Sequence, residues 1–141
     1  MEASHIIGEI KTFYKEGVEY RSQDRHLTEA DVERWSIACG WSRSQLFDEI
    51  AKGLALGYNA SELLFDFCDM VVNDLASPVT NTSGPKPQIF WEVYSAFDAG
   101  EYYHGDNRDE DPVEVYTRPM IARVVELLAT GPVNQPAALD Q

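Results

Sequence analysis

Carboxylates are crowded into one segment of this sequence. Eight of them lie between positions 92 and 114, against the single base Arg108: Glu92, Asp98, Glu101, Asp106, Asp109, Glu110, Asp111 and Glu114. Like charges this close repel one another and destabilise the folded chain unless a cation comes near. The segment therefore predicts a site for a basic partner or for a cation.

Two adjacent tyrosines, Tyr102 and Tyr103, lie inside the acidic segment. Tyrosine offers a large, stiff contact area with a hydrogen-bonding tip, and it is enriched at binding hot spots. Carboxylates around such rings steer a basic protein toward them. We expect a partner-binding surface made of the two rings and six nearby acids: Asp98, Glu101, Asp106, Asp109, Glu110 and Asp111. The alternative is a purely structural acidic surface, with the rings packed under the loop.

Metal and catalytic chemistry have weaker signals. His5, His26 and His104 are too scattered to form a helical ligand pair. Asp106, Asp109 and Asp111 loosely resemble a calcium loop, but the central glycine and the closing glutamate of an EF-hand are missing. No phosphate-binding glycine loop and no Ser/His/Asp order is present. We expect no enzyme activity, no cofactor and no metal.

The region 28–57 has the outline of a helix-turn-helix. Gly40 permits the positive dihedral angle that a tight turn between two helices needs. Its second helix would present Arg43, Gln45 and Lys52 to base edges, but it also carries two acids. A regulatory DNA-binding protein is therefore the alternative function.

The charge of the whole chain disfavours nucleic acid and membranes as partners. The formal net charge is −13, and residues 58–141 hold 14 acids against 4 bases. Such a surface repels phosphates and anionic lipids, whereas a basic protein is a suitable partner. The chain shows no basic leader and no apolar run of ~18 residues, so we expect a cytoplasmic protein. Cys39 and Cys68 occupy apolar helical positions, which favours buried free thiols.

The elements that must position these residues are helices, because apolar residues recur at helical spacing almost throughout. Cap and stop residues then give the expected bounds of each helix. The helices are expected from Ser4 to Gly17, from Thr28 to Gly40, from Ser42 or Ser44 to Gly57, from Asn59 or Ser61 to about Leu75, from Pro87 to Gly100 and from Thr117 to Gly131. Three prolines and a glycine make 77–87 an exposed connection.

The predicted fold is an all-α, single-domain bundle of five or six helices, with the acidic loop before the last helix. At 141 residues and 44% hydrophobic content, the chain is long enough to bury one core. We expect the domain to cover residues 1–131 and a flexible C-terminal tail to cover 132–141.

The segment from Glu101 to Pro112, read EYYHGDNRDEDP, resembles part of the immunity proteins of nuclease colicins and pyocins. Those proteins place a tyrosine pair, an acidic stretch and a proline before a closing amphipathic helix. Here the helix would carry Ile121, Val124, Val125 and Leu128, so the resemblance spans about 101–128. It implies an inhibitor of a secreted toxin, with the tyrosines and acids in contact with a basic toxin or nuclease domain. The chain is longer than those four-helix proteins, and 117–119 interrupts the match.

Overall fold

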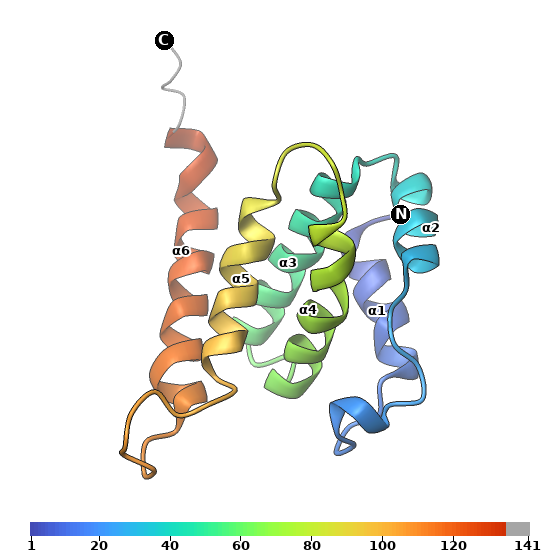
Figure 1. Ribbon diagram of the computed structural model, residues 1–141. Helices are drawn as coiled ribbons and strands as arrows, with labels where there is room; N and C mark the ends of the chain where they lie inside the picture. The colour runs from blue at the N-terminus through green and yellow to red at the C-terminus, as the bar shows by residue number, and fades with distance from the viewer. Residues whose placement is uncertain (135–141) are drawn as a thin grey trace.

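The computed structural model describes residues 1–134, which form helices and loops without any strand (Figure 1). This confirms the predicted all-α bundle. The α-helices are α1 (Ala3–Phe13), α2 (Glu29–Cys39), α3 (Arg43–Asn59), α4 (Phe65–Thr80), α5 (Gln88–Ala99) and α6 (Arg118–Asn134). A short 3₁₀ turn, η1 (Tyr20–Ser22), lies between α1 and α2, and a π-helical turn, η2 (Val113–Thr117), leads into α6. None of the helices in the described range has the length and apolar character that a bilayer span needs.

Helix α3 lies at the centre of the bundle and contacts α1, α2, α4, α5 and α6. It can do so because its apolar residues occur on more than one side of the helix. Leu46, Phe47 and Ile50 are fully buried, as are the small residues Ala51 and Ala55. Small side chains at these positions let neighbouring helices approach α3 closely.

The start and end signals of α2 and the start signal of α3 are confirmed, whereas Gly57 does not end α3, which continues to Asn59. The Thr28 hydroxyl accepts a hydrogen bond from the Asp31 amide, and the Asp31 carboxylate accepts one from the Thr28 amide, which is a complete capping box. Gly40 ends α2 with φ of 69° in the left-handed region, where a side chain would be strained. Ser42 rather than Ser44 caps α3.

The predicted start of the fourth helix was wrong. We expected it at Asn59 or Ser61, but α3 runs to Asn59 and α4 begins only at Phe65. The intervening chain turns sharply, because Ser61 adopts a positive φ of 62° and the amides of Glu62 and Leu63 bond back to the Gly57 carbonyl. These contacts satisfy the last carbonyls of α3. The helix then continues through Pro78 to Thr80, so the exposed connection is shorter than expected.

Both ends of the last helix also differ from the prediction. Thr117 is not an exposed cap: it is fully buried at the end of η2, and its hydroxyl donates to the Ala96 carbonyl at 2.7 Å. Gly131 does not end the helix, since α6 continues to Asn134. The rest of the predicted tail, 135–141, lies outside the described residues.

The two cysteines carry free thiols, as expected. Cys68 is fully buried, and burial raises the pKa of its thiol. Cys39 is only half-buried at the end of α2. Neither thiol therefore adds a covalent constraint to the bundle.

Candidate functional site

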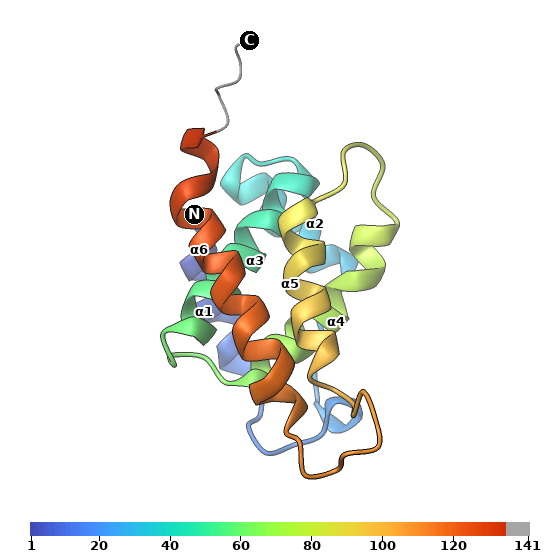
Figure 2. The ribbon, with the colours of Figure 1, turned by 90° about the vertical axis from the view of Figure 1, so that its left-hand side faces the viewer.

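The acidic loop 100–112 and the turn η1 lie at the same end of the bundle. The loop connects α5 to η2, and η1 lies in the connection between α1 and α2. Figures 1 and 2 show both segments at the lower end, on opposite sides of it in Figure 1. We call this region the acidic end, comprising segment 14–23, the first half of α4 and residues 98–112.

The tyrosine pair of the loop is exposed and also held in place. Tyr102 and Tyr103 are 51% and 44% exposed. The ring of Tyr102 stacks on His104, with centroids 4.4 Å apart, and His104 in turn contacts Tyr116 at 3.9 Å. The guanidinium of Arg108 lies over the Tyr103 ring at 4.6 Å. One side of each ring is thus used inside the loop, while the rest faces solvent.

His104 ties the loop to the end of α5. Its Nε2 lies 2.8 Å from the Ala99 carbonyl oxygen, which can only accept, so Nε2 carries the proton. This bond satisfies one of the free carbonyls at the helix C-terminus. This hydrogen bond therefore fixes the stacked rings of Tyr102, His104 and Tyr116 relative to α5.

The predicted acids separate into two groups. Asp106, Asp109 and Asp111 are exposed on the loop, and half-buried Glu110 accepts a hydrogen bond from the Tyr116 hydroxyl at 3.2 Å. Asp98 and Glu101 instead lie near α4, where they add to the effect of burial in raising the pKa of Asp69. The structure therefore does not bring all six acids together into one surface.

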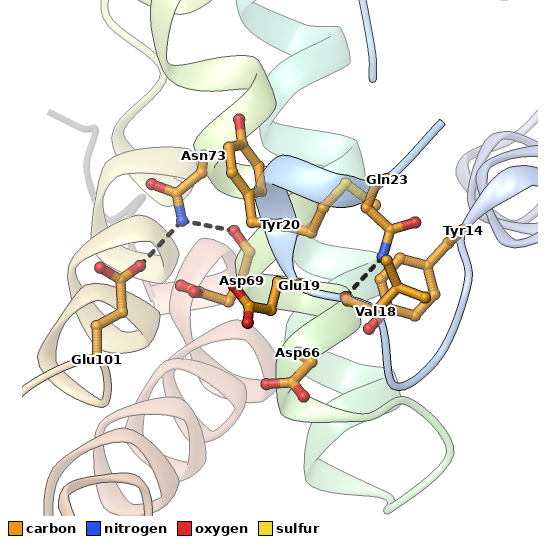
Figure 3. A pocket seen from close by; sticks show the side chains of 10 residues that line it. Tyr14, Val18, Glu19, Tyr20, Gln23, Asp66, Asp69, Asn73 and Glu101 are labelled. Carbon is orange, nitrogen blue, oxygen red and sulfur yellow. Dashed lines mark hydrogen bonds between the residues drawn. The ribbon is translucent and has the colours of Figure 1, made fainter. Parts of the chain in front are cut away.

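A cavity of about 500 Å³ lies between segment 14–23, α4 and Glu101 (Figure 3). Its lining contains the four carboxyl groups of Glu19, Asp66, Asp69 and Glu101. The other lining residues are the tyrosines Tyr14 and Tyr20, the side-chain amides Gln23 and Asn73, and the apolar residues Val18 and Met70. Within the described residues its lining contains no basic side chain. Of the eight residues predicted for partner binding, only Glu101 lines this cavity.

Asp69 is the most unusual group in the cavity wall. Its Oδ1 atom is buried and has no hydrogen-bond partner among the described residues. Asn73 donates to the Glu101 carboxylate at 2.9 Å and to the backbone carbonyl of Asp69, which holds Glu101 beside Asp69 (Figure 3). Burial, together with the neighbouring Glu101 carboxyl, raises the pKa of Asp69 to about 9. The Asp69 carboxyl is therefore protonated at neutral pH and can share its proton with Glu101.

The part of the cavity lining that α4 supplies has a signal in the sequence that the prediction missed. Asp66, Asp69 and Asn73 follow one another at spacings of three and four, so they share one face of α4. A polar row on an otherwise apolar helix indicates a solvent-facing or ligand-facing side. Tyr20 and Glu101 carried no comparable signal, because only the tertiary fold brings them to α4.

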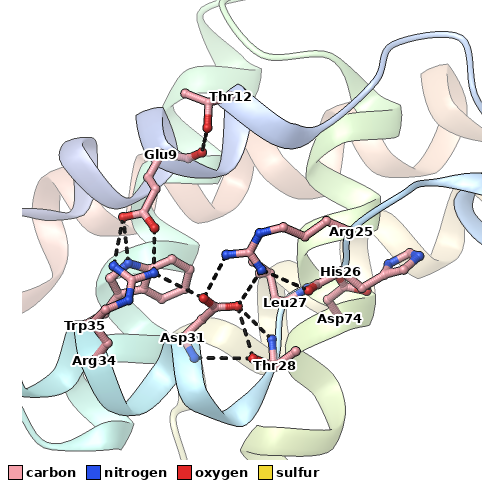
Figure 4. Close-up of polar contacts among 10 residues, drawn as sticks. All are labelled: Glu9, Thr12, Arg25, His26, Leu27, Thr28, Asp31, Arg34, Trp35 and Asp74. Atoms are coloured by element: carbon pink, nitrogen blue, oxygen red, sulfur yellow. Dashed lines mark hydrogen bonds and ion pairs between the residues drawn. The ribbon is translucent and has the colours of Figure 1, made fainter.

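Asp74 holds Tyr20, one of the residues that line the cavity. Figure 4 draws Asp74 together with His26 and Leu27. The Asp74 side chain is 1% exposed and accepts hydrogen bonds from the Tyr20 hydroxyl at 2.6 Å and the Leu27 amide at 2.8 Å. His26 Nδ1 lies 2.9 Å from the same carboxylate. One buried carboxylate of α4 thus holds the long connection between α1 and α2 in place.

A second polar network fixes α1 against α2 (Figure 4). Glu9 accepts from Arg34 at 2.6 Å and from the Trp35 indole at 3.1 Å. Asp31 binds Arg25 at 2.9 Å in addition to capping α2. Burial alone would raise the pKa of Asp31, but the bonds from Arg25, Thr28 and Arg34 outweigh it and lower that pKa to about 2. These groups are fully paired, so we assign them a structural role.

The structure offers no assembled metal centre in residues 1–134. No three His, Cys, Asp or Glu side chains there lie close enough to hold a metal ion. In the loop, the Asp109 amide bonds to the Asn107 side chain and the Val113 amide to the Asp111 side chain, both at 3.0 Å. Asp109 thus takes part in a local turn through its backbone amide, and Asp111 through its carboxylate.

We found no family model, no curated protein and no solved structure that matches this chain significantly. The resemblance of 101–128 to colicin immunity proteins therefore stays a prediction.

Proposed function

We propose that this protein binds a basic protein through its acidic end. The observation that carries this proposal is the cavity, in which four carboxylates meet without a basic side chain, beside two exposed tyrosines. An ordinary domain pairs its buried carboxylates, as Asp31 and Asp74 are paired here. The carboxylates of the cavity have no basic side chain beside them in its lining and are complementary to an external cation.

The proposed mechanism has two steps. The exposed acids of the loop attract the partner, and such steering raises association rates by ~10 to 10³-fold at low salt. Tyr102 and Tyr103 then supply the contact area that keeps the complex together. Because His104 and Arg108 already hold the rings, little ordering of the loop opposes binding.

The more specific form of the proposal is an inhibitor of a toxin. The resemblance of 101–128 to immunity proteins would make the partner a nuclease domain, whose basic substrate-binding surface suits the acidic end. A nuclease covered in this way loses access to its phosphate-bearing substrate. The inhibitor would act in the cytoplasm, where such a toxin meets its target.

The position of α3 argues against the DNA-binding alternative. A recognition helix has to leave one face free for the major groove. Here α3 is the central helix, in contact with five others. Arg43 contacts Glu29 and Thr82, and Lys52 contacts Glu49, so two of the three groups expected to face DNA have partners within the fold.

The first experiment identifies proteins that bind to the acidic end. The full chain, immobilised, is exposed at low salt to a lysate of its own source, and a matched bait carries Asp106→Asn, Asp109→Asn and Asp111→Asn. We expect a basic protein that is retained by the native chain, is released by salt and is depleted on the matched bait. Retention of a protein that changes neither with the salt concentration nor with these substitutions would contradict the proposal.

Affinity measurements on that partner then separate anchors from steering charges. We expect Tyr102→Ala or Tyr103→Ala to weaken binding by about 2 kcal/mol, mainly through faster dissociation. Asp106→Ala should change mainly the association rate and its salt dependence. Leu127→Ala, an exposed apolar residue on α6, is the control. Equal small effects of all four substitutions would rule out the anchoring role of the tyrosines.

A further inference from the structure

The cavity at the acidic end combines two features of organic-cation sites. Its carboxylates come from three separate parts of the chain: Glu19 beside η1, Asp66 and Asp69 on α4, and Glu101 at the start of the loop. The phenol rings of Tyr14 and Tyr20 form part of the same wall. Aromatic faces attract ammonium and guanidinium groups, and carboxylates add charge-assisted hydrogen bonds.

One oxygen of the Asp69 carboxyl, Oδ1, is buried without a hydrogen-bond partner among the described residues. A buried carboxylate oxygen is normally bonded, because an unbonded one loses its hydration without compensation. Asp69 Oδ1 has no such partner among residues 1–134, although Glu101 lies beside it. Burial, together with the neighbouring Glu101 carboxyl, raises the pKa of Asp69. A donor supplied from outside the chain would complete this group.

The arrangement of the carboxylates suits an organic cation better than a metal ion. A metal needs several ligands that converge on one point at about 2 to 2.6 Å. No group of three candidate ligands in the described part of the chain lies that close together. The acids instead surround a volume of about 500 Å³, which has room for the end of a long side chain.

We propose that this cavity binds one alkylammonium or guanidinium group, carried by a lysine or arginine side chain of the basic partner. The source of the side chain rests on the proposed function, whereas the binding of the cationic group itself does not. The cation donates to Asp69 and Glu101 and lies against the tyrosine rings. This assigns Asp69, Asp66 and Glu19 a recognition role that the loop acids do not share.

The test uses free amino-acid derivatives, so that no partner needs to be known. The full chain is titrated with Nα-acetyl-arginine amide and Nα-acetyl-lysine amide while backbone amide NMR shifts are followed. Nα-acetyl-citrulline amide, neutral and nearly the shape of arginine, is the ligand control. Asp69→Asn removes the cavity carboxyl that a bound cation would contact, and Glu92→Gln makes the corresponding change at an exposed position of α5.

We expect saturable shifts within 14–23, 66–73 and Glu101 for the cationic derivatives and none for citrulline. The stronger of the two cations identifies the side chain. Asp69→Asn should weaken binding about tenfold, which corresponds to about 1.4 kcal/mol. Glu92→Gln, at an exposed residue that does not line the cavity, should change it by less than about twofold. Binding of citrulline, equal losses in both variants or the absence of saturable shifts would each overturn the proposal.

The two proposals can fail separately. If a basic partner binds through Tyr102 and Tyr103 and Asp69→Asn leaves its affinity unchanged, the proposed function stands and the cavity proposal is wrong. If the cationic derivatives bind at the cavity but no basic protein is retained from the lysate, the cavity proposal stands and the proposed function is wrong.

Discussion

At the residue scale, two aspartates of this protein have pKa values displaced in opposite directions. Asp31 is surrounded by donors from Arg25, Arg34 and Thr28, which stabilise its charged form. Asp69 is largely buried and has the Glu101 carboxyl beside it, and both effects stabilise its protonated form. An ionised aspartate therefore stabilises the folded state at position 31 and destabilises it at position 69.

Asp69→Asn is expected to make the protein more stable at neutral and alkaline pH. The pKa of Asp69 is about 9 in the folded state and near 3.8 in the unfolded state. Between these values the unfolded chain releases a proton that the folded chain keeps, so the native protein loses stability as pH rises. We expect a gain of more than about 1.4 kcal/mol at pH 8, the equivalent of one pKa unit. Denaturant unfolding at several pH values measures it.

The matched control for this prediction is Glu92→Gln, which removes an exposed carboxylate on α5. It should change stability little at any pH. The advantage of Asp69→Asn should shrink as the pH approaches 4. A gain that is the same at pH 4 and pH 8 would show that titration of Asp69 is not its cause.

Asp31→Asn is expected to destabilise the protein, with the opposite pH dependence. The pKa of Asp31 is about 2 in the folded state and 3.8 in the unfolded state. Its contribution is present above pH 4 and is lost as pH falls toward 2. We expect a loss of roughly 1 to 2 kcal/mol at pH 7. Thermal unfolding checks this, because the native protein and the variant should converge near pH 2.

At the scale of elements, Gly100 determines how the acidic loop leaves α5. A Cβ at this position would collide with the Thr117 hydroxyl and with the ring of Phe65. The loop therefore passes close to both η2 and the start of α4. Gly105, by contrast, lies in the loop itself with no other group near the position of a Cβ.

Gly100→Ala is therefore expected to destabilise the protein by about 1 to 3 kcal/mol, as overpacking does. Gly105→Ala should be nearly neutral, and it controls for the loss of glycine. Urea unfolding compares the two variants, and amide NMR shifts report whether residues 101–117 move. If both substitutions changed the free energy of unfolding equally, the close approach of Thr117 and Phe65 to Gly100 would not be the cause of the destabilisation.

The helices could be predicted from the sequence because apolar spacing and cap residues agree along most of the chain. The errors occurred where a side chain has a tertiary role that resembles a local one. Leu63 and Leu64 continue a helical pattern, but Leu63 packs over Gly57 outside any helix. Thr117 has the type of a helix cap, but its hydroxyl bonds to α5 instead.

The candidate site was only partly predictable. Tyr102, Tyr103 and the loop acids stand together in the sequence, so their common location needs no knowledge of the fold. The cavity depends on how α1, α4 and α5 are arranged, which no local pattern specifies. The missing partner of Asp69 is likewise a property of the packed structure, since any exposed aspartate is satisfied by water.

At the scale of the whole molecule, charge is distributed unevenly. The chain carries a net charge of −13, and seven of its acids lie within 98–114 at one end of the bundle. The opposite charges elsewhere pair across helices, as Arg34 does with Glu9 and Arg43 with Glu29. Repulsion is therefore concentrated at the acidic end.

Added salt is expected to stabilise this protein. Screening over a Debye length of about 10 Å at 0.1 M weakens repulsion among the acids. The ion pairs also weaken, but exposed pairs contribute only about 0 to 1 kcal/mol each. We expect the midpoint of thermal unfolding to rise with NaCl, and to rise less in the variant with Asp106→Asn, Asp109→Asn and Asp111→Asn. A midpoint that falls with salt would mean that the ion pairs dominate.

The walls of the cavity are supplied early and late during synthesis of the chain. Tyr14 and Tyr20 leave the ribosome long before Glu101, because α4 and most of the other helices lie between them in the sequence. A nascent chain that stops short of Glu101 lacks one of the four carboxylates of the cavity. Any ligand of this cavity would consequently distinguish finished molecules from truncated ones.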